Sequence, residues 1–228
     1  MRVTFVGHSC FLVESLAGRV IFDPFLSGNE QASLAPDQVE VDAVLLTHGH
    51  GDHVGDAAQI ARRLNVPVVA VYELATLLGW QGVDTRPQHI GGAVDYPFGW
   101  VKFTHATHGT GYVDEANHQI TYCGGAAGIL YTAGGKTVFH LGDTGLTSDL
   151  ALLGQRHRID LALVPIGDQY TMGPEDAAEA VRMIAPARVV PCHYNTFPAI
   201  KQDPRKFVEA VNGAADVVVL SPGDSFDV

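Results

Sequence analysis

The chain has 228 residues, of which 46% are hydrophobic and 17% charged, and its 25 acidic against 14 basic residues give a formal net charge of −11. This acidic balance argues against binding to nucleic acid, which requires a basic surface. No run of about 18 apolar residues is present, which argues against a membrane span, and no export signal precedes residues 2–6. We expect one cytoplasmic domain over residues 1–228, with its three cysteines as reduced thiols.

The first third of the chain is rich in strand-like segments. Apolar and β-branched residues predict strands over residues 3–6, 11–14, 19–22, 43–46 and 68–71. Before the last of these strands, residues 56–64 have helical spacing and stop ahead of Asn65 and Pro67, which favour the end of a helix. The sequence therefore predicts a strand–helix–strand step here.

Glycine pairs mark turns in the middle of the chain, and in the last third strands again alternate with helices. Gly134 and Gly135 predict a turn that joins strands 128–132 and 137–141 as a hairpin. Further on, the pattern predicts a strand over 160–164, a helix over 174–184, a strand over 188–192, and a last helix and strand. Pro174 and Pro204 suit the first position of a helix, and Asp203 can cap the second of these helices.

Two segments, residues 42–48 and 160–166, resemble each other as buried strands that lead into polar loops. This similarity indicates two halves built on one plan. We therefore expect an α/β fold in which two sheets pack face to face with helices outside.

The densest group of chemically functional residues directly follows the strand predicted at 43–46. Residues two apart in an extended stretch point to the same side, so His48 and His50 can converge on one ion while Asp52 and His53 reach a neighbouring position. Imidazole and carboxylate groups are good ligands for zinc and related divalent metals. The sequence therefore predicts two adjacent metal sites at this loop.

The pattern His48-x-His50-x-Asp52-His53 resembles the signature of the metallo-β-lactamase superfamily, and the resemblance extends over most of the chain. It implies a four-layer αββα sandwich and two divalent metal ions, with zinc favoured and manganese or iron as alternatives. It also implies a third histidine for the first ion, a late histidine for the second ion, and a bridging aspartate. By position these are His108, His193 and Asp143, with His105 as a competitor of His108.

Other segments resemble a branch of small bacterial metal-dependent hydrolases that is similar to L-ascorbate-6-phosphate lactonase; they are residues 7–9, 22–26, 78–82, 166–168, 171–176 and 193–198. From its place at a strand end, His8 is expected to contact substrate, to orient a metal ligand, or to be a structural histidine. Asp23 and Asp168 are expected to support the metal loops, and His140 to support the loop of Asp143.

The predicted function is hydrolysis of a small ester, lactone or phosphoester by a hydroxide that the two metal ions generate at neutral pH. Asp52 or Asp143 is the candidate catalytic group that guides a proton, and the candidates for stabilising the developing oxyanion are Tyr170, Tyr194 and Asn195. The substrate is a small molecule, and an anionic one stays compatible because bound cations dominate the local field. The alternatives are a phosphodiesterase and a non-catalytic metal- or ligand-binding protein. A homo-oligomer is a further alternative, since a neighbouring subunit could complete the pocket.

Overall fold

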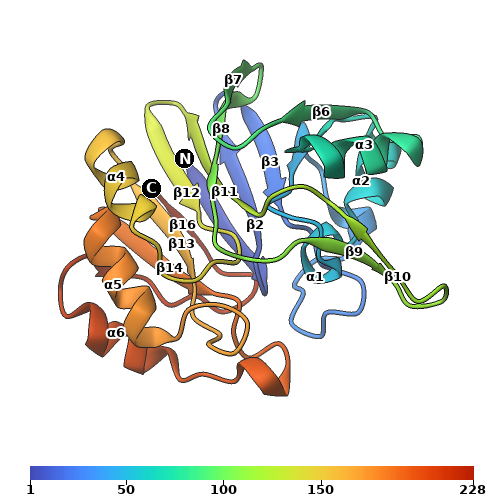
Figure 1. The fold of residues 1–228 in the computed structure, drawn as a ribbon. Helices are drawn as coiled ribbons and strands as arrows, with labels where there is room; N and C mark the ends of the chain where they lie inside the picture. Colours follow the sequence, from blue (N-terminus) through green and yellow to red (C-terminus); the bar gives the residue numbers. More distant parts are fainter.

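The structure is a computed structural model that describes residues 1–228, and it contains two seven-stranded sheets packed face to face (Figure 1). The first sheet has the order β16-β1-β2-β3-β4-β5-β6. Its strands are β1 (Arg2–Gly7), β2 (Cys10–Ser15), β3 (Gly18–Phe22), β4 (Ala43–Leu45), β5 (Val68–Val71), β6 (Thr85–Gln88) and β16 (Ser225–Asp227).

The second sheet has the order β15-β14-β13-β12-β11-β8-β7. Its strands are β7 (Ala93–Tyr96), β8 (Gly99–His105), β11 (Ala127–Ala133), β12 (Lys136–His140), β13 (Leu161–Pro165), β14 (Arg188–Cys192) and β15 (Asp216–Val217). A separate two-stranded ribbon, β9 (Gly111–Asp114) and β10 (Gln119–Tyr122), projects from the body.

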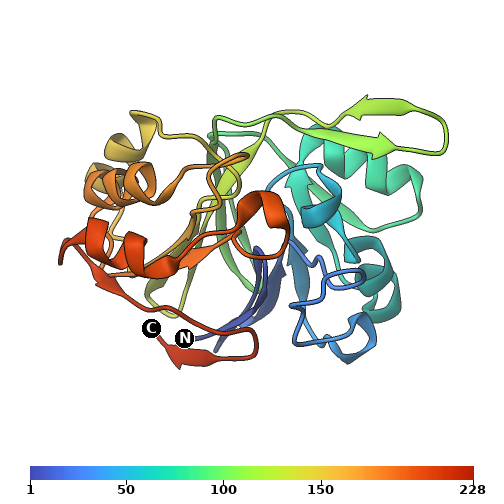
Figure 2. The same cartoon turned by 90° about the horizontal axis from the view of Figure 1, so that it is seen from below.

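Helices cover the outer faces of both sheets, which gives four layers in the order α, β, β, α (Figure 2). Beside the first sheet lie α1 (Gly51–Val54), α2 (Ala57–Leu64) and α3 (Tyr72–Trp80), and beside the second lie α4 (Asp149–Arg156), α5 (Pro174–Ile184) and α6 (Pro204–Val211). Short 3₁₀ turns occur at Pro36–Gln38 and Pro198–Ile200. None of the helices is long and apolar enough to span a membrane.

Each sheet combines an antiparallel part with a parallel part. Strands β3 to β6 run parallel in the first sheet, and β12 to β15 run parallel in the second. Because the carboxyl ends of parallel strands meet at one edge, the loops that follow β4, β12, β13 and β14 can gather at the same end of the sandwich. The two similar segments noted in the sequence, around β4 and β13, are the corresponding strands of the two halves.

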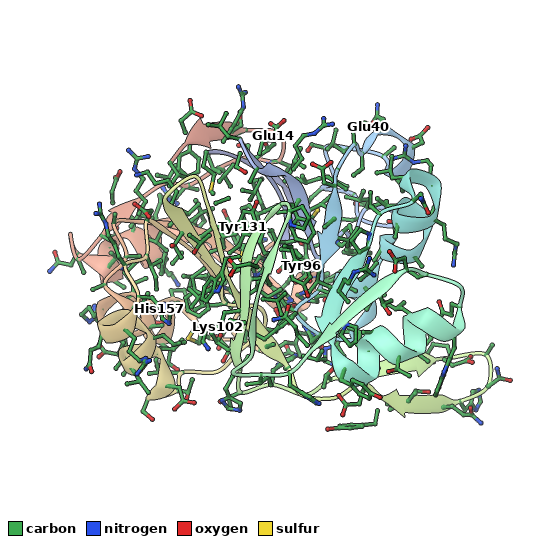
Figure 3. All side chains as sticks on the ribbon, turned by 90° about the horizontal axis from the view of Figure 1, so that it is seen from above. Glu14, Glu40, Tyr96, Lys102, Tyr131 and His157 are labelled. Atoms are coloured by element: carbon green, nitrogen blue, oxygen red, sulfur yellow. The ribbon has the colours of Figure 1, made fainter.

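The core lies mainly between the two sheets. One cluster of 41 buried residues draws on both sheets and on the helices of the first half, and a second cluster of 17 fills the space beneath α4, α5 and α6. Phe22 of the first sheet meets Tyr131 of the second edge to face, with ring centroids 6.1 Å apart. Figure 3, which views the end of the molecule opposite α1, labels Tyr131 between the sheets.

The structure confirms the predicted sandwich, the hairpin of β11 and β12, and the helix over residues 174–184. Pro174 and Pro204 stand at the first turn of their helices, and the Asp203 side chain accepts from the Arg205 N–H as the predicted cap. Three helices were not predicted, one of which is α4 at Asp149–Arg156. Residues 51–54 form α1 in a glycine-rich stretch, and residues 72–80 form α3 directly after β5.

Candidate metal centre

The predicted metal ligands lie in loops at one end of the sandwich, each shortly after a strand. His48, His50, Asp52 and His53 follow β4, and the last two of them stand in α1. His108 follows β8, Asp143 follows β12, and His193 comes directly after β14. Residues from both sheets therefore converge because the two sets of strands end at the same edge.

Three histidines form the first cluster. The Nδ1 atom of His50 lies 2.9 Å from Nε2 of His48 and 3.3 Å from Nε2 of His108. His48 is fully buried, whereas the other two reach the pocket surface. One ligand atom from each can therefore face a common ion.

The second cluster contains Asp52, His53 and His193, with His8 beside them. The Oδ2 atom of Asp52 lies 3.6 Å from Nε2 of His193 and 4.0 Å from Nε2 of His53. Both histidines are buried, and Asp52 is open to the pocket.

Asp143 lies between the two clusters. Its Oδ2 atom is 3.0 Å from Nε2 of His193, 3.3 Å from Nε2 of His53, and 3.6 Å from Nε2 of His108. One nearly buried carboxylate thus approaches histidines of both clusters. A carboxylate in this position can contact an ion held by either cluster.

Several buried polar atoms of this centre have no hydrogen-bond partner: Nε2 of His53, Nδ1 and Nε2 of His193, and Oδ1 of Asp143. Buried polar groups are normally paired, because leaving one unpaired costs about 1–3 kcal/mol. Close approach without hydrogen-bond geometry is what ligand atoms around a cation show. The residues present therefore fit one or two divalent ions with nitrogen and oxygen ligands.

Buried hydrogen bonds hold several ligands in place from behind. The Asp23 carboxylate accepts from the Thr47 N–H at 2.8 Å and the Thr47 hydroxyl at 2.6 Å, and pairs with Nδ1 of His53 at 2.8 Å. This turns Nε2 of His53 toward the cluster, as carboxylate partners of metal-binding histidines do. His140 pairs with the Ser9 carbonyl at 2.9 Å and accepts from the Gly142 N–H at 3.0 Å, directly before Asp143.

Charge and burial shift the pKa values of the metal-free centre in opposite directions. Burial lowers the pKa of His193, but the nearby Asp143 and Asp52 carboxylates outweigh it and raise this pKa to about 9. Burial also lowers the pKa of His53, but the charges of Asp143 and Asp23 outweigh it and raise this pKa well above its usual value. Burial would raise the pKa of Asp143, but the charges of His193 and His53 hold it well below its usual range. In the first cluster, burial lowers the pKa of all three histidines, His48, His50 and His108.

A pocket of about 270 Å³ opens over both clusters, and its lining consists of His50, Asp52, His108, Asp143, Tyr170, His193 and Phe197. Tyr170 and Phe197 are its two aromatic walls, and both are partly exposed. A second pocket, lined by Arg86, Tyr96 and Phe98 among others, lies near the starts of β3, β4 and β5. It belongs to the opposite end of the sandwich, where Figure 3 labels Tyr96.

Some predicted site residues lie outside this pocket. The exposed Asp168 side chain has no hydrogen bond to the ligands, although its turn positions Tyr170, since the Thr171 N–H donates to the Asp168 carbonyl. Tyr194 and Asn195 line a neighbouring groove instead. His105 points away from the clusters, with its ring 3.5 Å from Asp149.

Sequence reasoning did not assign roles to Phe197, to Thr196 or to Gln31. Thr196 lies 2.8 Å from Nδ1 of His8 and donates to Gln31 at 3.2 Å. Thr196 and Phe197 lie in segment 193–198, whose resemblance to other hydrolases indicates no particular contact, and Gln31 has no signal in the sequence.

The sandwich with metal-ligand loops at one end defines the class of the protein, and comparison with known proteins agrees. The sequence model of the "Beta-lactamase superfamily domain" matches residues 2–193. A "UPF0173 metal-dependent hydrolase" of Bacillus cytotoxicus is 55% identical over 225 residues, which cover 99% of both chains. A protein of the same name from Bacillus cereus is 53% identical over the same share of both chains. The chain therefore belongs to the β-lactamase superfamily and, within it, to the UPF0173 metal-dependent hydrolase family.

Solved structures give the same result. A "novel metallo hydrolase" of the archaeon Ignicoccus hospitalis is 32% identical, with a TM-score of 0.89 and coverage of 100% of this chain and 98% of that chain. The isothiocyanate hydrolase of Delia radicum gut bacteria is 20% identical, with a TM-score of 0.77 and coverage of 100% and 99%, and it shares the fold.

Proposed function

We propose that this chain is a metal-dependent hydrolase that binds two divalent ions and cleaves a small ester or lactone. The observation that carries the proposal is the place of Asp143, whose Oδ2 atom lies within 3.6 Å of histidines from both clusters. A carboxylate in this position can join two ions in one centre. Two ions held in this way lower the pKa of water toward neutrality and polarise the substrate oxygen.

The protein residues around the centre then bind the substrate and move its protons. Asp143 holds the two metal sites at a fixed separation, and Asp52, which is open to the pocket, accepts or guides a proton. We assign to the Tyr170 hydroxyl the role of donor to a developing oxyanion, which the presence of Tyr170 in the pocket lining supports. The nitrogen and oxygen ligand set suits zinc, and it also suits manganese or iron.

The pocket lining favours a carbonyl substrate over a phosphoester. None of its lining residues is a lysine or an arginine, so the wall of this pocket offers no such side chain to a phosphate group. Its two non-ligand walls are the aromatic rings of Tyr170 and Phe197, which suit an apolar substituent. Lys201 lies in the adjacent groove that shares Phe197.

The test compares hydrolysis of a short lactone, a nitrophenyl ester and bis(nitrophenyl) phosphate by zinc-loaded protein, before and after chelation and metal return. We expect faster turnover of the lactone or ester, with loss on chelation and recovery with zinc. Phe197→Ala should raise KM for the apolar substrate severalfold, whereas the control Lys201→Ala should not. A tenfold preference for the phosphodiester would refute the substrate class. Absence of turnover at full metal loading would refute a hydrolytic function for these substrates.

A further inference from the structure

His8 of the first sheet and His193 of the second lie side by side at the end of the sandwich that holds the metal-ligand clusters. Each residue directly follows a strand, β1 or β14, and each has a left-handed backbone, with φ of 57° and 53° respectively. The His193 N–H donates to the His8 carbonyl at 2.9 Å. Such conformations are unfavourable in residues other than glycine and concentrate at functional sites. The fold therefore holds both rings at the second cluster at an energetic cost.

The His8 ring is fully buried and lies beside the ligands of the second cluster. Its centroid is 4.1 Å from that of His193, and its Nε2 atom is 3.2 Å from Oδ2 of Asp52. One ligand atom of His8 lies within 4.8 Å of those of Asp52, His53 and His193. Ligand atoms bound to one ion at the usual bond lengths are about 3.0–3.4 Å apart, so the separation from Asp52 fits a shared ion.

Hydrogen bonding on the other side of the ring indicates which nitrogen is free. The Thr196 hydroxyl donates to Oε1 of Gln31 at 3.2 Å, so its oxygen is left to accept from Nδ1 of His8 at 2.8 Å. Nε2 then presents a lone pair to the Asp52 carboxylate. Two acceptors face each other at this distance only when a cation or a proton lies between them.

We propose that Nε2 of His8 is an additional ligand of the metal ion held by Asp52, His53 and His193. This assignment rests on the two-ion centre proposed above. It makes the second site richer in ligands than the three-histidine first site, and it makes Thr196 the residue that fixes the tautomer of His8.

The test uses Co²⁺ as the probe, with metal-free wild-type protein, His8→Gln, Thr196→Val and His157→Gln as a remote control (Figure 3). Calorimetric titration should give two bound ions in wild type and control. In His8→Gln, affinity for the second ion should fall by at least about 10–100-fold while the first ion is unaffected. Thr196→Val should weaken the second ion less, because the imidazole remains.

Proton NMR of Co²⁺-loaded protein with ¹⁵N-labelled histidine gives a second readout, which is measured on wild type and uses His8→Gln only to assign the His8 signal. In wild type, the His8 Nδ1–H should appear among the hyperfine-shifted exchangeable signals and be missing from His8→Gln. Unchanged second-ion affinity in His8→Gln, together with an unshifted His8 signal in wild type, would overturn the assignment and leave His8 as a hydrogen-bonded neighbour of Asp52. Wild-type protein that binds only one Co²⁺ would instead refute the two-ion centre.

Discussion

Nε2 of His193 lies 3.0 Å from Oδ2 of Asp143, yet this buried nitrogen has no hydrogen bond. The two residues follow neighbouring parts of the second sheet, His193 after β14 and Asp143 after β12, with β13 between those strands. Sheet geometry alone therefore brings them together. Their contact joins the second cluster to the proposed bridging carboxylate.

Replacement of the bridge should affect both metal sites. Asp143→Asn keeps the size of the side chain but removes the negative charge, so binding of two cations side by side becomes unfavourable. We expect loss of at least one ion and a fall in kcat of about 100-fold or more. Metal analysis after desalting and steady-state kinetics check this result. The exposed Asp149→Asn is the matched control, and equal metal content in the two variants would contradict the bridging role.

Metal binding should release protons. In the metal-free protein the pKa of His193 is raised to about 9, so this residue is protonated at pH 7.5 and must lose its proton to bind a cation. His53, with its raised pKa, adds to the release, whereas His48, with a lowered pKa, adds none. The proton count, measured by calorimetry in buffers of different ionisation enthalpy, should decrease as pH rises through about 9. Heats that do not depend on the buffer at pH 7.5 would contradict this.

The Asp23 carboxylate, which pairs with Nδ1 of His53, should affect the affinity for the second ion without binding that ion. Asp23→Asn loses the charged partner of Nδ1 of His53 and one acceptor for Thr47. We expect affinity for the second ion to fall about 10–100-fold, with the first ion less affected. The control is Asp42→Asn, which lies at the opposite end of the sandwich and accepts from the Arg19 N–H. An unchanged second affinity in Asp23→Asn, measured by metal titration, would show that this hydrogen bond does not orient the ligand.

One glycine in the metal loop is required by its backbone. Gly55 has φ of 40°, and a Cβ atom there would lie 2.4 Å from the Pro24 carbonyl oxygen. Gly55→Ala should therefore destabilise the fold by about 1–3 kcal/mol and lower Tm. Gly51→Ala is the matched control, because a Cβ atom there meets nothing within 4 Å. Thermal unfolding of the metal-free proteins should give a lower Tm for Gly55→Ala than for Gly51→Ala. Equal Tm values would contradict backbone strain at residue 55.

Local patterns were enough to predict much of the fold. The helix over residues 174–184 has a proline start and an apolar face that fills the space under the second sheet, so propensity and packing agree. The helix α1 was missed because its first residue, Gly51, and the residue that ends it, Gly55, have low helix propensity. The helical conformation of α1 is instead stabilised by tertiary contacts of His53, such as its pairing with Asp23.

The ligand positions could be predicted because they stand in a dense motif or beside strand ends. The contacts that orient them could not. Thr196, for example, reaches His8 only because β1 and β14 end side by side in different sheets, and Gln31 completes this contact from a third loop. Tyr170 and Phe197 likewise face one pocket from separate loops, which no local spacing encodes.

The most direct test of the central claim is metal content per chain on gently purified protein, combined with lactone and ester hydrolysis before and after chelation. We expect close to two divalent ions per chain and an activity that disappears with the ions and returns with them. Full activity without bound metal, unchanged by replacement of His48 and Asp143, would contradict it.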